Sequence, residues 1–334
     1  MESVMHSEVD FNQNGKHCGY IRLPHSVHRS AYGWIPLPVA SIKNGAGPKV
    51  VLSAGVHGDE YEGQIIVQAL INTLEAKDIE GQLILLPMAN FPAAQAGMRT
   101  SPIDQVNMNR VFPGDPQGST TQVMAHFIET VVLSGADYFI DIHSGGQSLE
   151  YLPLAMANIE GDDTHQQRLK GMLDSLALTY TMLFGDDDQS WFSAAGAYRQ
   201  GACAVTVELG GGGRVNNQYR VKFQSALLRF FSVVKLYSND VEEIKQTTQY
   251  VESKANQQVF SYVNGLFEPL VALGDSVKTG QLLAYIHHPE TPLSKATEIF
   301  SSSDGSVICQ RAMAPTQRGD CLFELVSPYS GQFL

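Results

Sequence analysis

The segment VVLSAGVHGDEYEG (residues 50–63) decides the fold, because it joins two kinds of pattern within a short stretch. Residues 50–55 form a continuous apolar run that ends in glycine, which predicts a buried strand. A polar loop follows. The next segment, GQIIVQALINTLEA (63–76), carries apolar residues at helical spacing and predicts a helix. A buried strand that leads directly into a helix is typical of an α/β fold.

The same alternation repeats along the chain up to about residue 235. Further strands are predicted at 82–90, 136–146 and 202–213, and further helices at 120–133, 165–178 and 219–234. Residues 1–48 read as short strands and turns, broken by Gly, Pro and Asn. We therefore expect an α/β domain over residues 1–245, with a mixed, largely parallel sheet flanked by helices.

The pattern changes beyond residue 250. Short apolar segments alternate with Gly-Asp and Thr-Gly turns, as in VALGDSVKTGQLLAYI (271–286). This pattern predicts a small all-β module, a barrel or a sandwich, over residues 250–334. The polar stretch at 237–249 would link the two parts.

Composition and charge restrict the class of partner and the compartment. The formal net charge of -12 disfavours nucleic acid, and no apolar run reaches the ~20 residues that a membrane span needs. The four cysteines lack metal-ligand or disulfide-framework spacing, and no signal-peptide pattern is present at the N-terminus. We expect a cytoplasmic protein that acts on a small molecule, with homo-oligomerisation left open.

Titratable side chains follow the predicted strands where these strands end. His57 and Glu60 follow the first strand, and His143 ends another. Ligands of open α/β sheets bind at the carboxyl ends of strands, so these residues are expected to converge. Two histidines and one glutamate are a ligand set of catalytic zinc sites that leave a position open for water. We therefore predict one Zn²⁺ per chain, held by His57, Glu60 and His143.

Two further segments supply the other groups that amide hydrolysis needs. Glu208 stands at a third strand end, before four glycines, and is the candidate general base and acid. Arg99, Asn109 and Arg110 lie in a Gly- and Pro-containing loop region. An arginine there can bind a substrate carboxylate by a two-pronged hydrogen bond or stabilise an oxyanion.

Each of these residues alone is compatible with a structural role, and the joint placement carries the prediction. Glu62 is an alternative ligand to Glu60. Asp59 is expected to cap the helix that follows it. Asp141, two residues before His143, is either an orienting partner of a ligand or a buried polar residue of the core.

Four segments together resemble the succinylglutamate desuccinylase/aspartoacylase family, a branch of the zinc carboxypeptidase-like fold. They are GVHGDEYEG (55–63), NMNRVFPG (107–114), DIHSGG (141–146) and VELGGGG (207–213). The resemblance implies that His57, Glu60 and His143 hold one zinc and that Glu208 transfers protons. It also implies that Asn109 and Arg110 bind the substrate carboxylate, and that Arg99 polarises the scissile carbonyl.

The combined expectation is a zinc-dependent hydrolase that cuts the amide bond of a small N-acyl amino acid and releases a free amino acid and a carboxylate. The NMNRVFPGDP segment resembles bacterial members acting on substrates such as acetylated diaminobutyrate. Two alternatives stay open: a metallocarboxypeptidase acting on peptides, and a binding module without metal. The Gly-Asp turns also resemble lipoyl-type modules, but no lysine stands in the required hairpin, so lipoylation is not expected.

Overall fold

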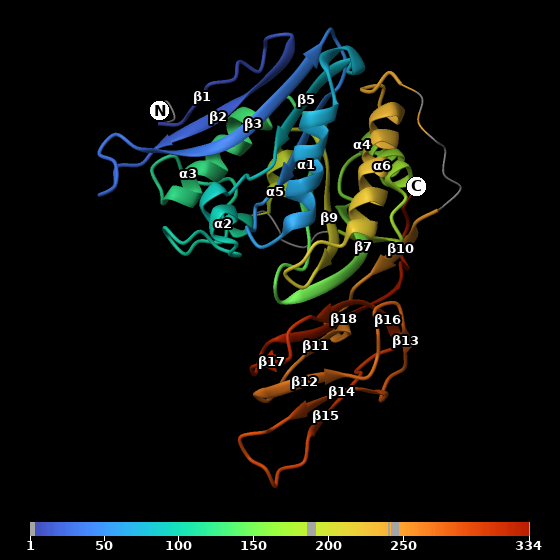
Figure 1. Cartoon of the computed structure of the whole chain (residues 1–334). Coiled ribbons are helices and arrows are strands. Elements are labelled where there is room, and N and C mark those ends of the chain that lie inside the picture. The colour runs from blue at the N-terminus through green and yellow to red at the C-terminus, as the bar shows by residue number, and fades with distance from the viewer. Residues whose placement is uncertain (1–3, 186–191, 240, 242–246, 334) are drawn as a thin grey trace.

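The computed structural model describes residues 4–185, 192–239, 241 and 247–333, and it places an α/β part above a smaller β part (Figure 1). The strands of the α/β part are β1 (His6–Ser7), β2 (Gly15–Pro24), β3 (Trp34–Asn44), β4 (Lys49–Ala54), β5 (Gly81–Leu86), β6 (Tyr138–His143), β7 (Leu149–Asn158), β8 (Tyr180–Phe184) and β9 (Cys203–Gly211). Its helices are α1 (Tyr61–Thr73), α2 (Phe91–Ala96), α3 (Thr120–Phe127), α4 (Asp163–Leu176), α5 (Ser193–Arg199) and α6 (Asn217–Val233). The α/β expectation is confirmed.

The main sheet is mixed, and its centre is parallel. The strands lie in the order β1-β2-β3-β5-β4-β6-β9-β7-β8, and β5, β4, β6 and β9 pair in parallel. Antiparallel pairs flank this centre, between β3 and β5 on one side and between β9 and β7 on the other. The expectation of a largely parallel sheet therefore describes the centre rather than the whole sheet.

The N-terminal region forms a longer structure than the sequence pattern suggests. Strands β2 and β3 pair along their whole length, from Gly15 opposite Lys43 to Pro24 opposite Trp34. The prediction of short strands over residues 1–48 was wrong here because the prolines of β3 sit inside the strand without ending it. This hairpin adds to the edge of the sheet through β5.

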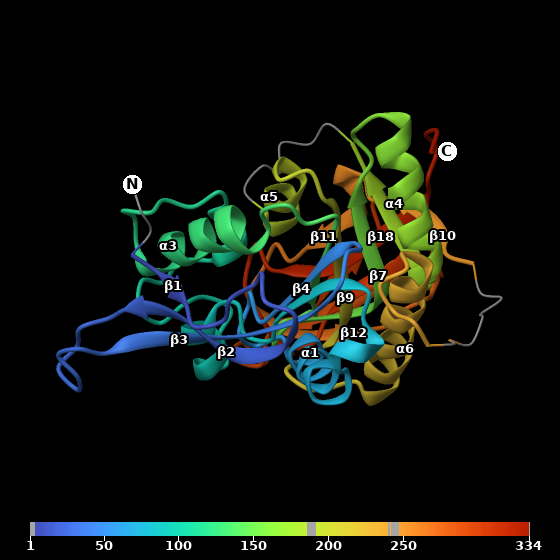
Figure 2. The same ribbon diagram turned by 90° about the horizontal axis from the view of Figure 1, so that it is seen from above.

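Helices cover both faces of the sheet, as the view from above shows (Figure 2). Buried side chains of α1, α4 and α6 form one apolar cluster with β4, β5, β6 and β9. Those of α3 and α5 form a second cluster, together with the N-terminal hairpin. Because the central strands are buried on both faces, their polar residues are concentrated at the strand ends. None of the described helices combines the length and the apolar character that crossing a bilayer requires.

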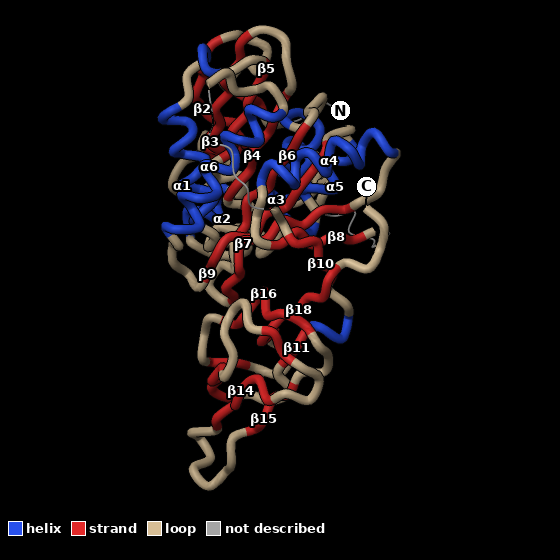
Figure 3. Tube along the Cα trace, turned by 90° about the vertical axis from the view of Figure 1, so that its right-hand side faces the viewer, coloured by secondary structure: helices blue, strands red, loops and turns tan. Residues whose placement is uncertain are grey.

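The C-terminal part is built from β10 (Gln249–Glu252), β11 (Gln258–Phe260), β12 (Gly265–Pro269), β13 (Ser276–Val277), β14 (Leu282–His287), β15 (Thr297–Phe300), β16 (Gly305–Arg311), β17 (Pro315–Thr316) and β18 (Cys321–Pro328). It lies below the α/β part in Figures 1 and 3. Strands β12, β14, β15 and β17 form a second sheet, whose buried side chains pack with those of β16 and β18.

Strand pairing joins this part to the α/β part. Strand β10 pairs with β8, and β16 pairs with residues 149–151 of β7. The division into domains at residues 245 and 250, and the description of the second part as a barrel or sandwich, stay predictions. Residues 240 and 242–246 of the expected linker lie outside the described residues.

Candidate active site

The loop after β4 turns sharply, and glycines permit the turn. Gly55 has a φ of +68°, which a side chain would disfavour. At Gly58 a Cβ atom would lie 2.0 Å from the backbone of Ala93, so only glycine fits. This turn places His57 and Glu60 over the carboxyl end of the sheet, with Glu60 at the N-cap position of α1.

The predicted helix cap was wrong. Asp59 does not cap α1, because its Oδ2 accepts the backbone N–H of Gln147 at 2.9 Å. Asp59 thereby ties the loop after β4 to the loop after β6. Glu62 is also engaged elsewhere, since its Oε1 accepts the backbone N–H of Asn216 at 3.0 Å.

The ends of β6 and β9 bring the second histidine and the candidate base together. His143 is the last residue of β6 and stands opposite Glu208 in the parallel register with β9. Register partners on neighbouring strands point to the same face of a sheet. His143 and Glu208 therefore approach His57 and Glu60 from the sheet side.

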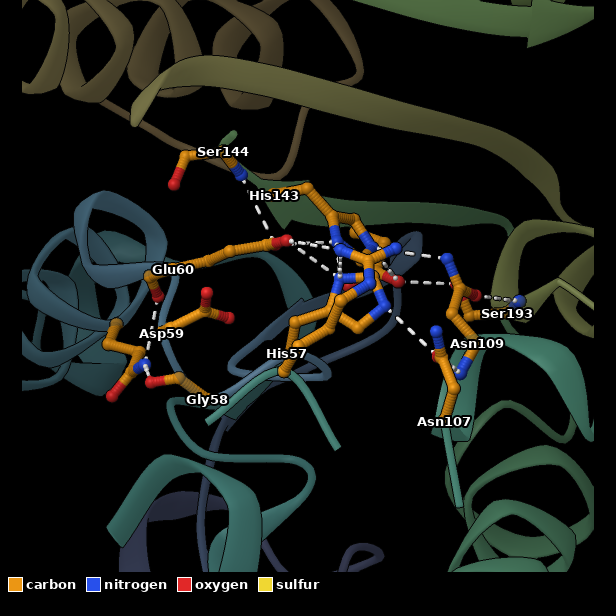
Figure 4. A network of polar contacts seen from close by, with 12 residues as sticks. His57, Gly58, Asp59, Glu60, Asn107, Asn109, His143, Ser144 and Ser193 are labelled. Carbon is orange, nitrogen blue, oxygen red and sulfur yellow. Dashed lines mark hydrogen bonds and ion pairs between the residues drawn. The ribbon is translucent and has the colours of Figure 1, made fainter. Parts of the chain in front are cut away.

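His57, Glu60 and His143 form a compact buried cluster (Figure 4). The Nδ1 atom of His57 lies 2.7 Å from Glu60 Oε1, and the Nδ1 atom of His143 lies 2.8 Å from Glu60 Oε2. The two Nδ1 atoms are 3.2 Å apart. Their side chains are at most 4% exposed. Sequence reasoning thus identified residues that the fold does bring together.

The far nitrogens of both rings contact oxygen atoms outside the cluster. The Nε2 atom of His57 lies 3.0 Å from Asn107 Oδ1, and the Nε2 atom of His143 lies 2.9 Å from Asp141 Oδ2. When Nε2–H donates to such an oxygen, the Nδ1 lone pair faces inward, as a metal ligand requires. Asp141 is held in turn by the hydroxyl of Ser193. Of the two interpretations of Asp141, the geometry favours the orienting partner.

The cluster fits a tetrahedral divalent cation. Two nitrogens bound to zinc at ~2.0–2.1 Å with tetrahedral angles would lie roughly 3.3 Å apart. The two Nδ1 atoms are 3.2 Å apart, with the Glu60 carboxylate on their open side. The backbone N–H of Ser144 donates to Glu60 Oε2 at 3.2 Å and fixes the orientation of this carboxylate.

Opposing charges set the ionisation of the cluster. Burial alone would raise the pKa of Glu60, but the two facing imidazoles outweigh burial and hold this pKa below its usual range. Burial would lower the pKa of His143, but Asp141 and Glu60 together raise it well above its usual value. The carboxylates of Glu60 and Asp141 therefore place negative charge beside the two imidazoles, and this favours binding of a cation.

The two predicted arginines lie at the cavity wall in different settings. Arg99 Nη1 is 3.3 Å from His57 Nδ1 and 3.5 Å from Glu60 Oε1, so it reaches the His57–Glu60–His143 cluster. Arg110 donates from Nη1 to the carbonyl oxygen of Asn109 at 2.7 Å and stacks over the ring of Phe192. Desolvation and then the charge of Arg99 lower the pKa of Arg110. An anion placed between the two guanidinium groups would relieve this repulsion.

Asn109 is more buried than the sequence suggests, with 6% of its surface exposed. Its Oδ1 accepts the backbone N–H of Ser193 at 2.9 Å, and its Nδ2 lies 3.5 Å from His143 Nε2. These contacts align Asn109 with the histidine and with the start of α5. Its role in binding a substrate carboxylate stays a prediction.

Glu208 lies in the wall of the same cavity as the metal cluster. Its Oε2 atom is buried and has no hydrogen-bond partner among the described residues. Burial, followed by the charge of Glu60, raises the pKa of Glu208 well above its usual value. A carboxyl group with spare bonding capacity and a raised pKa is suited to accept and return a proton.

The cavity has a volume of about 910 Å³ and unites all seven predicted site residues. It also includes groups that the sequence analysis did not identify, among them Tyr151 of β7 and Glu324 of β18. Asn107, which contacts His57, was missed as well, although it stands two residues before Asn109 in the same motif. For Glu324 the sequence offered no signal, because FELV (323–326) reads as an ordinary strand.

Comparison with known proteins identifies relatives over nearly the whole chain. Residues 46–234 match the succinylglutamate desuccinylase/aspartoacylase catalytic domain. The N-alpha-acetyl-L-2,4-diaminobutyric acid deacetylase of Halomonas elongata is 36% identical over 323 residues, which is 96% of this chain and 94% of that protein. A succinylglutamate desuccinylase of Vibrio vulnificus is 24% identical over 56% of each chain.

Solved structures share the architecture. The product-bound ectoine utilization protein EutE (DoeB) from Ruegeria pomeroyi superposes with a TM-score of 0.93 and 31% identity, covering 98% of this chain and 99% of that chain. A succinylglutamate desuccinylase/aspartoacylase from Rhodobacter sphaeroides superposes with a TM-score of 0.91 and 30% identity, covering 98% and 100%. The C-terminal strands are therefore common to this chain and these structures.

Proposed function

Because this chain belongs to the succinylglutamate desuccinylase/aspartoacylase family, we propose that it is a zinc-dependent hydrolase that cuts the amide bond of an N-acyl amino acid. The observation that carries the proposal is the convergence of His57, Glu60 and His143 in a cavity that also contains Glu208 and two arginines. This combination supplies a metal site, a proton carrier and anion-binding groups in one place.

His57, Glu60 and His143 would hold the metal ion. A divalent cation bound there supplies a Lewis acid that acidifies water and polarises the amide carbonyl. Asn107 and Asp141 orient the two imidazoles through their Nε2 atoms. The choice of zinc rests on the His₂Glu ligand set, which is that of catalytic zinc sites with one open position.

Glu208 is the proposed proton carrier. Its Oε2 atom, which has no hydrogen-bond partner within the described part of the chain, would accept a proton from the attacking water, and the protonated carboxyl would then donate this proton to the leaving amine. Burial, followed by the charge of Glu60, raises the pKa of Glu208, which favours uptake of a proton by this carboxylate.

The arginines are assigned to negative charge on the substrate. Arg99, which reaches His57 and Glu60, would stabilise the developing oxyanion of the scissile carbonyl. Arg110 would bind the α-carboxylate, with its guanidinium held by the carbonyl of Asn109 and by the ring of Phe192. Asn109 joins this carboxylate site or orients it.

For the substrate we propose an N-acetylated diamino acid such as N-acetyl-2,4-diaminobutyrate. The support is the Halomonas elongata deacetylase, to which this chain is 36% identical over nearly the full length of both proteins. The succinylglutamate desuccinylases match over a shorter region and at lower identity. An N-succinyl amino acid is therefore the less favoured substrate.

The test is a screen of the purified, metal-loaded protein. N-acetyl-2,4-diaminobutyrate, N-acetylaspartate, N-succinylglutamate and a set of short peptides are incubated with and without a chelator, and free amine is measured. We expect release from the acetylated diamino acid that the chelator abolishes and added zinc restores. Preferred cleavage of peptides would instead identify a metallocarboxypeptidase, and protein that binds no stoichiometric metal would identify a binding module.

A further inference from the structure

The C-terminal strands contribute a carboxylate to the catalytic cavity, and the strand register explains how. Cys309 of β16 stands opposite Tyr151 of β7 on one side and opposite Glu324 of β18 on the other. Glu324 also stands opposite Gln258 of β11. Because β16 pairs with both β7 and β18, Glu324 lies in the cavity wall although it is near the end of the chain. Tyr151 and Glu208 line the same cavity.

Neutral groups surround the carboxylate of Glu324. The side chains of Ser253, Gln258 and Tyr151 hydrogen-bond to it. Within the part of the chain that the structure describes, no lysine or arginine pairs with it. The nearby Lys254 forms its ion pair with Glu252, at 2.9 Å.

A desolvated carboxylate without a cation is costly, and the direction of its pKa reflects this cost. Burial raises the pKa of Glu324 from its usual value although three neutral partners act in the opposite direction. A ligand that brings a positive charge to this wall would remove the penalty. Groups whose pKa is shifted by burial cluster at functional sites.

The cavity carries charges of both signs. Arg99 and Arg110 line it, with Arg99 in reach of His57 and Glu60. Glu324 lines it from the C-terminal strands, where Lys254 also lines the wall but pairs with Glu252. Glu208 lies within electrostatic range of both Glu60 and Glu324. A substrate with a carboxylate at one end and an ammonium group at the other matches this arrangement.

We propose that Glu324 is a specificity-determining residue that binds the free ammonium group of the substrate side chain. The proposal rests on the proposed function and deepens it, because an N-acetylated diamino acid keeps one amine free. Tyr151, Ser253 and Gln258 hold the carboxylate in place, and the ammonium group would donate to it. An N-acyl amino acid with an apolar side chain would leave Glu324 without a cation and would be selected against.

The test compares two substrates that differ in one group. N-acetyl-2,4-diaminobutyrate carries a side-chain ammonium group where N-acetylnorvaline carries a methyl group. We expect wild-type kcat/KM to favour the ammonium compound, and Glu324→Gln to reduce this preference by about 10- to 100-fold, the range for a hydrogen bond to a charged group. The control is Glu268→Gln, a carboxylate that pairs with His287 on the outer surface of β12. It should leave the preference unchanged.

The outcomes separate this inference from the proposed function. If wild type hydrolyses both compounds and Glu324→Gln keeps the preference or slows both equally, Glu324 has a structural role and the inference is overturned. If wild type hydrolyses neither, the proposed substrate is wrong, and the proposed function fails if the wider screen also finds no N-acyl amino acid that is cleaved. Calorimetry then measures the affinities of the wild-type protein for free 2,4-diaminobutyrate and for norvaline, which tests the inference without hydrolysis. The same measurement is used if Glu324→Gln does not fold. Equal affinity of wild type for the two amino acids would overturn the inference.

Discussion

The His57–Glu60–His143 cluster and the other two carboxylates of the cavity, Glu208 and Glu324, differ in how completely their atoms are hydrogen-bonded. All four ring nitrogens of His57 and His143 contact a carboxylate or amide oxygen. Glu208, in contrast, has a buried oxygen without a partner among the described residues, and Glu324 is held by neutral groups. This difference is expected if the imidazoles hold a metal ion in a fixed arrangement and Glu208 and Glu324 keep bonding capacity for the substrate, as proposed above.

The largest effect should follow from the loss of a metal ligand. Replacement of His143 by Ala removes one of the three proposed ligands and leaves Asp141 without the imidazole that it contacts. We expect loss of stoichiometric zinc and of all measurable hydrolysis, because Lewis-acid activation is lost entirely. Elemental analysis and an amine-release assay measure this. His126→Ala, a change on helix α3, is the control and should retain metal and activity.

Replacement of Glu208 should lower activity without loss of metal, in contrast to replacement of His143. Glu208→Gln keeps the shape of the side chain but cannot take up a proton, so kcat should fall by about 10²–10⁴-fold. Zinc content should remain that of wild type, since Glu208 lies outside the ligand set. Full activity in this variant would mean that another group carries the proton.

A smaller change is expected at the outer partner of His143. Asp141→Asn weakens the hydrogen bond that orients the imidazole, and loss of such a partner typically costs 10–100-fold in metal affinity. Competition with a chromogenic chelator gives the affinity. Saturating zinc should restore most of the activity. Unchanged affinity would assign Asp141 to the core rather than to the metal site.

The smallest expected effect is on the free energy of unfolding, and here the substitution is expected to stabilise the protein rather than impair it. Because the pKa of Glu324 is raised in the folded state, its contribution is fully present below the unfolded pKa and is lost as pH rises through the folded pKa. The stability of Glu324→Gln relative to wild type should therefore increase as pH rises from the unfolded pKa through the folded pKa of Glu324, and Tm measured across this range checks it. A difference in Tm that is constant over this range would contradict the assignment.

The same contrast explains how much of the site could be predicted from sequence. His57 and Glu60 follow β4, His143 ends β6, and Glu208 lies in the last half of β9. Parallel pairing brings the carboxyl ends of such strands together. The local sequence pattern was therefore enough to predict that these four residues lie together. Asp59 was misread because its partner, Gln147, lies in another loop and only the folded chain shows the contact.

Features that depend on the register of distant strands stayed hidden. Glu324 reaches the cavity only because β16 pairs with both β7 and β18, and no local pattern in the sequence specifies those pairings. The sheet was predicted to be mixed, but which of its strands are antiparallel was not predicted, for the same reason. The long hairpin of β2 and β3 was obscured by its prolines, which lie in a strand that keeps its partner throughout.

The pairing of β16 with residues 149–151 of β7 also bears on how the protein tolerates shortening. A proteolytic fragment or an expression product that ended before β16 would expose the backbone amides of β7 along that edge. Unprotected edges of this kind add strands from other molecules and lead to aggregation. Removing the C-terminal strands is therefore expected to yield insoluble material rather than a smaller, less selective enzyme.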